Sequence, residues 1–254
     1  SFTLEDGLAD NVVNAFAEDK AGKVWVGTYN GVSIVGRSLE KTIGKDDGLP
    51  GHDVRSIAAS SEGMWLGIMG GGVVLYDGDI KKSYRAANGL ISDEVRVVTL
   101  ASSGEVFVGT NQGLSIVSGE TIRNYGNAEG FLDSRVFSVF PESKENIWIG
   151  TDKGLFHFDS ERFVRISGRD GLFDNKVYTV LDDGLGYLWM SSNKGVFRVS
   201  KQGAKDFVEG KQKKVVSEGF GTIDGMRSVE CNVVGSTSGW LRSAIEHRGE
   251  RRPD

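Results

Sequence analysis

The chain has 254 residues, of which 36 are glycine and three are proline, and its formal net charge is −5. This acidic balance provides no broad attraction for nucleic acid or for an anionic membrane, so we expect no nucleic-acid partner. No stretch approaches the ~20 apolar residues of a membrane span, and the first residues show no signal-peptide pattern, so we expect no membrane contact by this chain itself. Its single cysteine, Cys231, cannot form an internal disulfide, so packing alone must stabilise the fold.

The most regular feature of the sequence is a Gly-Leu or Gly-Phe pair that returns every 41 residues. Its five copies are Gly7-Leu8, Gly48-Leu49, Gly89-Leu90, Gly130-Phe131 and Gly171-Leu172. About eighteen residues after each pair comes an aromatic anchor, at Trp25, Trp65, Phe107, Trp148 and Trp189. Two anchors in register over five copies indicate an array of repeats that share one core. We therefore expect a single domain over residues 1–254.

Each repeat contains four short runs in which apolar and polar residues alternate. In the first repeat these runs are Val12 to Phe16, Lys23 to Val26, Val32 to Val35 and Lys41 to Ile43. Alternation with a period of two predicts strands. Four antiparallel strands in each repeat match one blade of a β-propeller, whose repeats run to roughly 40–50 residues. We therefore predict an all-β propeller of four-stranded antiparallel blades, with the first strand of each blade lining the central channel.

The predicted blades follow one another along the chain, five of them clear and the sixth irregular. They span residues 9–46, 50–87, 91–128, 132–169, 173–218 and 226–254, with a charged, partly helical insert over residues 201–214. Dipeptides such as Asp47-Gly48 predict turns with a positive φ where the chain crosses between blades, and the following Leu or Phe is expected to pin the crossing. The aromatic anchors are expected to fill the wedges between sheets, each removing ~150–250 Å² from water. The glycine beside each anchor is expected to let backbone and ring approach closely.

One copy of the second anchor reads Trp148-Ile149-Gly150-Thr151-Asp152-Lys153-Gly154-Leu155. With the Asp-Gly-Leu crossings, this pattern resembles the two-component regulator propeller repeat, and the resemblance covers roughly residues 1 to 231. The run from Phe220 to Asn232 resembles the end of the propeller in members whose output is often a diguanylate cyclase. The resemblance implies a non-catalytic, periplasmic or extracytoplasmic sensing region of a bacterial membrane receptor, with a histidine kinase or diguanylate cyclase module elsewhere in the parent protein.

The number of repeats bears on whether the blades form a closed ring. Propellers of this family usually have seven blades, so six predicted blades are consistent with a fragment of a seven-bladed ring. Residues 1–5 are predicted to supply the outer strand of the last blade and so to close the ring. The alternative is an open array whose exposed strand edges pair with a second copy to give a homodimer. Beyond Asn232 the expected glycine-rich turn is replaced by an irregular segment that contains Trp240.

The candidate binding residues are those that vary between blades at the start of each inner strand. Positions required by the architecture look alike in every repeat, whereas these positions differ and would lie at the rim of the channel, where pockets usually form. A mixture of charged and aromatic side chains there suits a small polar or anionic ligand. The candidates are His52, Asp53, Arg55, Asp93, Glu94, Arg96, Arg135, Lys176 and Tyr178. The alternative is that they are solvated rim residues paired with one another.

Other segments carry weaker signals. The second turn that reaches the rim, with Asn111-Gln112 and Asp152-Lys153 among its copies, has the composition of ordinary β-turns. Gly70-Gly71-Gly72 lacks the Lys-Ser/Thr ending of a phosphate-binding loop, so a flexible turn is the better interpretation. The acids Glu18-Asp19 and Asp182-Asp183 lie in turns on the opposite face, where a calcium role is the weaker interpretation.

Catalysis finds little support in the sequence. The three histidines fall in different blade positions, and no serine lies in a nucleophile-elbow pattern. We therefore predict no catalytic residue, no metal and no cofactor, and a sensing propeller that binds a ligand or a protein partner. Two alternatives stay open: a propeller enzyme of the lyase or lactonase type with a metal in the channel, and an interaction scaffold or dimerisation module.

Overall fold

The structure of the protein is a computed structural model that describes residues 2–131, 134–143 and 146–231. Within these ranges, five four-stranded antiparallel sheets follow one another, each with its strands in chain order. The first sheet comprises β1 (Val13–Glu18), β2 (Val24–Thr28), β3 (Gly31–Val35) and β4 (Leu39–Ile43). The second comprises β5 (Val54–Ala59), β6 (Met64–Ile68), β7 (Gly72–Asp77) and β8 (Asp79–Tyr84).

The remaining three sheets repeat the same order. The third comprises β9 (Val95–Leu100), β10 (Val106–Thr110), β11 (Leu114–Ser118) and β12 (Thr121–Tyr125). The fourth comprises β13 (Val136–Pro141), β14 (Ile147–Thr151), β15 (Leu155–Phe158) and β16 (Phe163–Ile166). The fifth comprises β17 (Thr179–Asp182), β18 (Tyr187–Ser192), β19 (Gly195–Ser200) and β20 (Ser217–Phe220).

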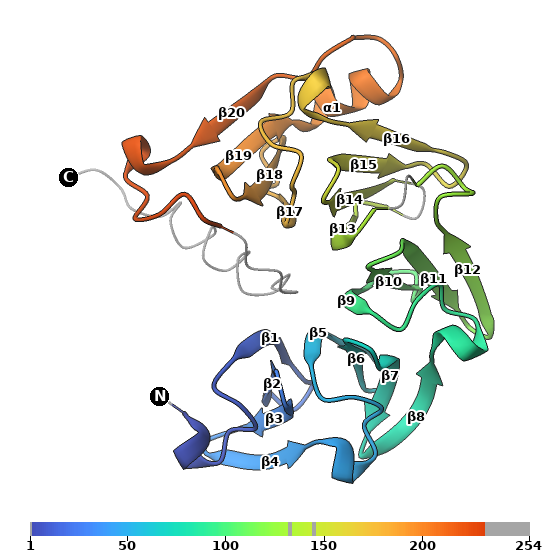
Figure 1. Cartoon of the computed structure of the whole chain (residues 1–254), viewed down its shortest axis with the longest axis vertical. Helices are drawn as coiled ribbons and strands as arrows, with labels where there is room; N and C mark the ends of the chain where they lie inside the picture. The colour runs from blue at the N-terminus through green and yellow to red at the C-terminus, as the bar shows by residue number, and fades with distance from the viewer. Residues whose placement is uncertain (1, 132–133, 144–145, 232–254) are drawn as a thin grey trace.

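The sheets are the blades of a partial propeller. Figure 1 shows them fanned around a central space, with β1, β5, β9, β13 and β17 innermost and the fourth strands outermost. The sheets of β1 and β17 lie at the two ends of this arc. The prediction of an all-β propeller with inner first strands is therefore confirmed for five blades. Of the predicted sixth blade, residues 226–231 form no strand, and residues 232–254 lie outside the described residues.

The core of the protein lies between the blades. Four apolar clusters each combine residues from two neighbouring sheets; one of them joins Trp25 and Ile43 of the first blade to Val54 of the second. Trp65, Phe107 and Trp148 occupy the corresponding wedges and are at most 5% exposed. Trp189 of the fifth blade is only half-buried, and no described sheet packs beyond it. Four of the five aromatic anchors therefore fill wedges between described blades as predicted.

The glycine beside each anchor has a different role from the one expected. A Cβ atom on Gly109 would lie 2.5 Å from methyl groups of Val97 and of Val136, which belongs to the inner strand of the next blade. The glycine therefore makes room for the following blade and not for its own ring. In the fifth blade Ser191 occupies this phase, and no described inner strand follows it.

Five of the turns that enter, link or leave the blades are short 3-10 turns closed by an acidic or amide side chain. The turns are Leu4–Asp6, Lys45–Asp47, Ala86–Asn88, Gly168–Asp170 and Thr222–Asp224, and each ends in a glycine with positive φ. In the first of them, Asp6 Oδ2 accepts the backbone N–H of Thr3 at 2.9 Å. The Asp of the Asp-Gly pair therefore holds the turn through its side chain.

The predicted closing strand over residues 1–5 is wrong for residues 2–5, which the structure describes. Leu4–Asp6 is a 3-10 turn that enters the first blade, and Leu8 behind it is buried against that blade. The reason is the repeat itself, because this segment carries the same turn chemistry as the crossing at Asp47-Gly48. A turn closed by Asp6 cannot also extend along an outer strand.

The insert after β19 begins with α1 (Lys201–Val208), which fastens the fourth blade to the fifth. Its buried side chains Ala204 and Val208 join the apolar cluster between these blades. Lys201 and Lys205 each place an Nζ atom within 3.0 Å of Glu142 Oε1, in the turn after β13. In the described part of the chain, no helix is long and apolar enough to cross a bilayer.

The acidic residues in the turns between the first and second strands accept hydrogen bonds from tryptophans of their own blades. Asp19 Oδ2 and Asp183 Oδ2 each accept an indole N–H at 2.9 Å, from Trp25 and Trp189 respectively, and Glu142 accepts that of Trp148 at 3.2 Å. Burial alone would raise the pKa of Asp19, but hydrogen bonds from Trp25 and from backbone N–H groups outweigh it and lower the pKa. These carboxylates therefore satisfy the buried tryptophans, and the weaker interpretation as calcium ligands gains no support.

Replacing Glu142 by glutamine is expected to loosen α1 in a pH-dependent way. Burial raises the pKa of Glu142, but hydrogen bonds from Lys205, Lys201 and Trp148 outweigh burial and lower it below its ordinary 4.5. Because the folded pKa lies below the unfolded one, this stabilisation is fully present above the ordinary pKa and is lost as the pH falls through the folded value. Glu142→Gln should therefore cost about 1–3 kcal/mol at neutral pH.

Urea unfolding of the two proteins at pH 7 and pH 3 measures this difference. We expect the difference in unfolding free energy between the wild type and Glu142→Gln to be smaller at pH 3 than at pH 7, because the unfolded carboxylate gains a proton as the pH falls and the stabilisation declines. A difference that is the same at both pH values would show that the charge of Glu142 does not hold the helix.

Candidate functional site

The candidate site lies at the channel end of the inner strands. There, the same repeat position in each of the five blades supplies one side chain. These residues are Asn14, Arg55, Arg96, Phe137 and Tyr178, each 41 residues after the last. Four of them occupy the second position of β1, β5, β9 and β13, and Tyr178 directly precedes β17. Neighbouring inner strands pack against each other, so Asn14 reaches Asp53 of the next blade, Arg96 lies over Phe137, and Phe137 packs on Tyr178.

Asp53 orients Arg55. The carboxylate is only 5% exposed, and its Oδ2 accepts from Nε and Nη2 of Arg55 at 2.8 and 2.7 Å. Its Oδ1 accepts from the side-chain amide of Asn14 in the preceding blade at 3.1 Å. A two-point pair of this kind fixes the guanidinium plane, so Asp53 is a positioning residue for Arg55.

Arg96 is held from the neighbouring turn and from the next blade. Its Nε donates to Oδ1 of Asn111, whose own amide donates to Glu94 at 2.6 Å. The guanidinium lies over the ring of Phe137, 5.5 Å from the centroid, and Phe137 in turn packs against Tyr178 at 5.0 Å. The arginine is therefore oriented by a polar chain on one side and an aromatic pair on the other.

Charges of both signs surround Arg96. The pKa of Arg96 is lowered, first by burial and then by the charges of Arg55 and Arg135, against the opposing effect of Glu94 and Asp152. We call Arg55, Arg96, Arg135, Phe137 and Tyr178 the rim cluster. Three guanidinium groups beside two aromatic rings favour an anion, because each offers several N–H donors in a planar arrangement.

The other predicted candidates have local partners. Asp93 accepts the backbone N–H of Ala86 at 2.7 Å and pairs with Arg85 at 3.1 Å, so it anchors a crossing turn. His52 packs edge-on against Tyr29 and contacts its backbone oxygen at 3.0 Å. Lys176 is exposed. These three residues therefore lie on the rim without joining the rim cluster.

The sequence carried only a weak signal for the residues that orient the rim arginines. Asn111 orients Arg96, and Asp152 accepts the backbone N–H of Arg135 at 2.9 Å. Both belong to the second rim turn, which has the composition of an ordinary β-turn. The variation of this turn between blades was the sequence feature that pointed to a role in the site. The turn holds Met69-Gly70 in one blade and charged or amide residues in others.

The arrangement offers binding groups for an anion. Among the described residues, no three His, Cys, Asp or Glu side chains are grouped as metal ligands would be. The polar groups of the rim cluster are guanidinium N–H donors and the Tyr178 hydroxyl, and these suit the recognition of a carboxylate, phosphate or sulfate.

Comparison with known proteins agrees with this fold. Residues 7–30 match the two component regulator propeller family. A comparison with curated protein sequences finds no match. Residues 7–30 therefore match this repeat, and the resemblance seen in the sequence is confirmed.

Solved structures also share the propeller fold. The chain is similar to the extracellular domain of a proposed hybrid two component system from B. thetaiotaomicron, with 22% identity and a TM-score of 0.69 over 88% of this chain and 30% of that one. It is also similar to PorZ, a surface component of the type-IX secretion system of Porphyromonas gingivalis, with 14% identity and a TM-score of 0.63 over 90% of this chain and 37% of that one.

An enzyme shares the fold as well. An inactive variant of virginiamycin B lyase from Staphylococcus aureus matches with 13% identity and a TM-score of 0.56, over 84% of this chain and 71% of that one. At such identities the likeness establishes the fold alone, because one fold hosts many functions. The chain is thus a partial β-propeller that resembles the extracellular domain of a two component system, and it spans about 30% of that protein.

Proposed function

We propose that this chain is the ligand-sensing propeller of a bacterial signal-transduction receptor, acting outside the cytoplasmic membrane, and that it binds a small anionic ligand at the rim cluster. The observation that carries the proposal is that Arg55 and Arg135, from the two neighbouring blades, lie near enough to Arg96 for their charges to lower its pKa. Two of these arginines are oriented by neighbouring side chains before any ligand arrives. The similarity to extracellular domains of two component systems supports the location.

The chemistry of the cluster supports an anion with a carboxylate or similar head. Arg96 is partly buried and close to other cations, so an anion there would relieve repulsion as well as gain hydrogen bonds. Phe137 and Tyr178 add an apolar surface beside the charge. A ligand with a charged head and a planar or ring-shaped body fits both parts of the cluster.

Thermal unfolding in the presence of paired probes tests the proposal. Glucuronate and glucose differ mainly by a carboxylate, so glucuronate should raise the unfolding temperature and glucose should not; citrate and sulfate extend the test to other anions. At 100 times the dissociation constant, a ligand stabilises the protein by about 2.7 kcal/mol. Oligosaccharides with and without a uronic acid extend the same comparison to larger ligands.

Arg96→Ala is expected to weaken the response to the active anion about tenfold or more, because a charged hydrogen bond contributes about 1.5–3 kcal/mol. Arg37→Ala removes the same charge from an exposed outer turn and serves as the matched control. An anion response that Arg55→Ala and Arg96→Ala leave unchanged would exclude the rim cluster as the site. Stoichiometric metal in the purified protein would favour the enzyme alternative, and a mass that rises with concentration would favour the scaffold.

A further inference from the structure

Two grooves lie between neighbouring blades on the face opposite the rim. The first, between the second and third blades, has Trp65 and Tyr84 in its lining and a volume of about 120 Å³. The second, between the third and fourth blades, has Phe107 and Tyr125 in the same places and a volume of about 450 Å³. We call them the Trp65 groove and the Phe107 groove. The two grooves occupy equivalent positions in successive repeats.

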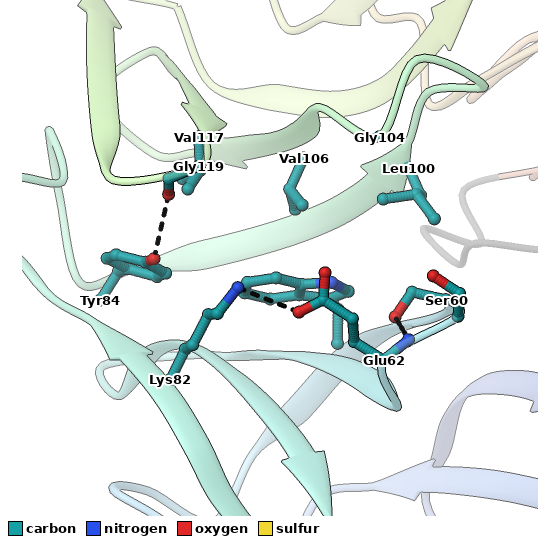
Figure 2. Close-up of a pocket in the computed structure, with 11 residues that line it drawn as sticks. Ser60, Glu62, Lys82, Tyr84, Leu100, Gly104, Val106, Val117 and Gly119 are labelled. Atoms are coloured by element: carbon teal, nitrogen blue, oxygen red, sulfur yellow. Dashed lines mark hydrogen bonds and ion pairs between the residues drawn. The ribbon is translucent and has the colours of Figure 1, made fainter.

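The Trp65 groove is closed by its own side chains. The indole of Trp65 stacks on Tyr84 with ring centroids 6.2 Å apart. Figure 2 shows the Tyr84 hydroxyl reaching Gly119 of the next blade and Lys82 paired with Glu62. The hydroxyl donates to the Gly119 carbonyl at 3.4 Å, and the ion pair measures 3.0 Å. Every polar group named here already has a partner across or along the groove.

The Phe107 groove is open because a smaller ring lies at its base. The anchor position is tryptophan in the four other blades and phenylalanine in the third alone. Tyr125 does not bridge to the next blade through its hydroxyl as Tyr84 does, but packs against the rings of Phe158 and Phe163 at 4.8 and 5.4 Å. The result is a groove of the size that binds small molecules, with aromatic walls.

A carboxylate lies in this groove with part of its hydrogen-bonding capacity unused. Glu105 is 9% exposed, and its Oε2 accepts from the Ser103 hydroxyl at 3.1 Å. Arg123, whose side chain is 61% exposed, comes only within 3.7 Å of Oε1, which is beyond hydrogen-bond distance. Asp159 and Glu161 add negative charge to the lining of the groove. A buried carboxylate oxygen without a close donor favours a cation that can donate several hydrogen bonds.

We propose that the Phe107 groove binds a primary ammonium group carried on an apolar body, with the ammonium at Glu105 and the body against Tyr125 and Phe158. The ammonium supplies the donors that Oε1 of Glu105 lacks, and the aromatic rings attract a cation as well as the apolar chain beside it. Two sources offer this chemistry, a free amine and a lysine side chain of another protein. The groove is remote from the rim cluster, so this inference stands or falls independently of the proposed function.

Calorimetric titration of the whole chain with 2-phenylethylamine tests the site, with 2-phenylethanol as the neutral counterpart of the same shape. The amine should bind at least tenfold more tightly than the alcohol. Glu105→Gln keeps the shape of the groove and removes its charge, and should weaken the amine at least tenfold. Glu62→Gln, the same change in the Trp65 groove, should leave the amine affinity unaltered.

Phe107→Trp is the sharper variant, because tryptophan occupies this position in the other blades and so suits the fold. It should fill the groove and abolish amine binding while circular dichroism and the unfolding temperature stay close to those of the wild type. Tighter binding of N-acetyl-phenylalanyl-lysine amide than of the free amine would identify a lysine-bearing partner, and the reverse order a free amine. Equal binding of amine and alcohol, or amine binding that survives Phe107→Trp, would overturn the proposal.

Discussion

Replacing Trp148 by alanine is expected to lower the free energy of unfolding by about 3–5 kcal/mol, the range for removing a buried aromatic side chain. Trp148 is fully buried between the fourth and fifth blades, and its indole N–H donates to Glu142. Removing the ring leaves a cavity in that interface and a carboxylate with one donor fewer. Because the interface joins two blades, the loss should appear as a shift of the whole unfolding transition in urea.

Trp189→Ala is the matched control for this prediction. Trp189 holds the same position in the fifth blade and donates to Asp183 in the same way, but it is half-buried. If wedge packing between blades is what the ring contributes, the cost at Trp189 should be no more than about half of that at Trp148. Equal costs at the two positions would mean that the ring stabilises its own sheet and not the interface.

Replacing Gly154 by alanine is expected to cost about 2–4 kcal/mol, although only one methyl group is added. Gly154 directly precedes the third strand of its blade, β15, and has a φ of +137°. A Cβ atom there would lie well inside van der Waals contact with the carbonyl oxygen of Ile166 on β16. The third and fourth strands would have to separate at their hydrogen-bonded end.

Gly184→Ala separates the cost of the left-handed backbone from the cost of the steric contact with Ile166. Gly184 also has a positive φ, 69°, but a Cβ atom there would meet open space. This variant should therefore show only the backbone cost of a left-handed residue, about 1–2 kcal/mol. The comparison uses urea unfolding of both variants against the wild type. If Gly154→Ala costs no more than Gly184→Ala, the close approach to Ile166 does not constrain the blade.

The sequence predicts the blades well because their requirements are local or strictly periodic. Alternation over five or six residues defines a strand, and a spacing of 41 residues brings Trp148 and Trp189 to equivalent places in separate sheets. The wrong prediction at residues 1–5 has the same origin. Apolar residues at Phe2 and Leu4 suit a strand, but the Asp6-Gly7 turn that follows them is closed by a hydrogen bond to Thr3, which alternation does not reveal.

The sequence predicted which positions lie at the rim but not which side chains bond to one another there. The repeat singled out Asp53, Arg55, Asp93 and Arg96 as rim residues that vary. It did not show that Asp53 orients Arg55, whereas Asp93 turns away to the crossing at Ala86. Nor did it show that Arg96 depends on Asn111, because two side chains fifteen residues apart meet only through the pairing of β9 with β10.

By itself, the sequence determined the four-stranded blade, its aromatic wedge and the turn that links one blade to the next. These features follow from periodic burial and from the backbone preferences of glycine, which act over a few residues. Only the tertiary structure decided which rim arginines converge, which carboxylates serve the turns, and that phenylalanine at position 107 leaves a groove open. Those outcomes depend on side-chain distances between blades, and a repeat of equal length places the blades without specifying what fills the space between them.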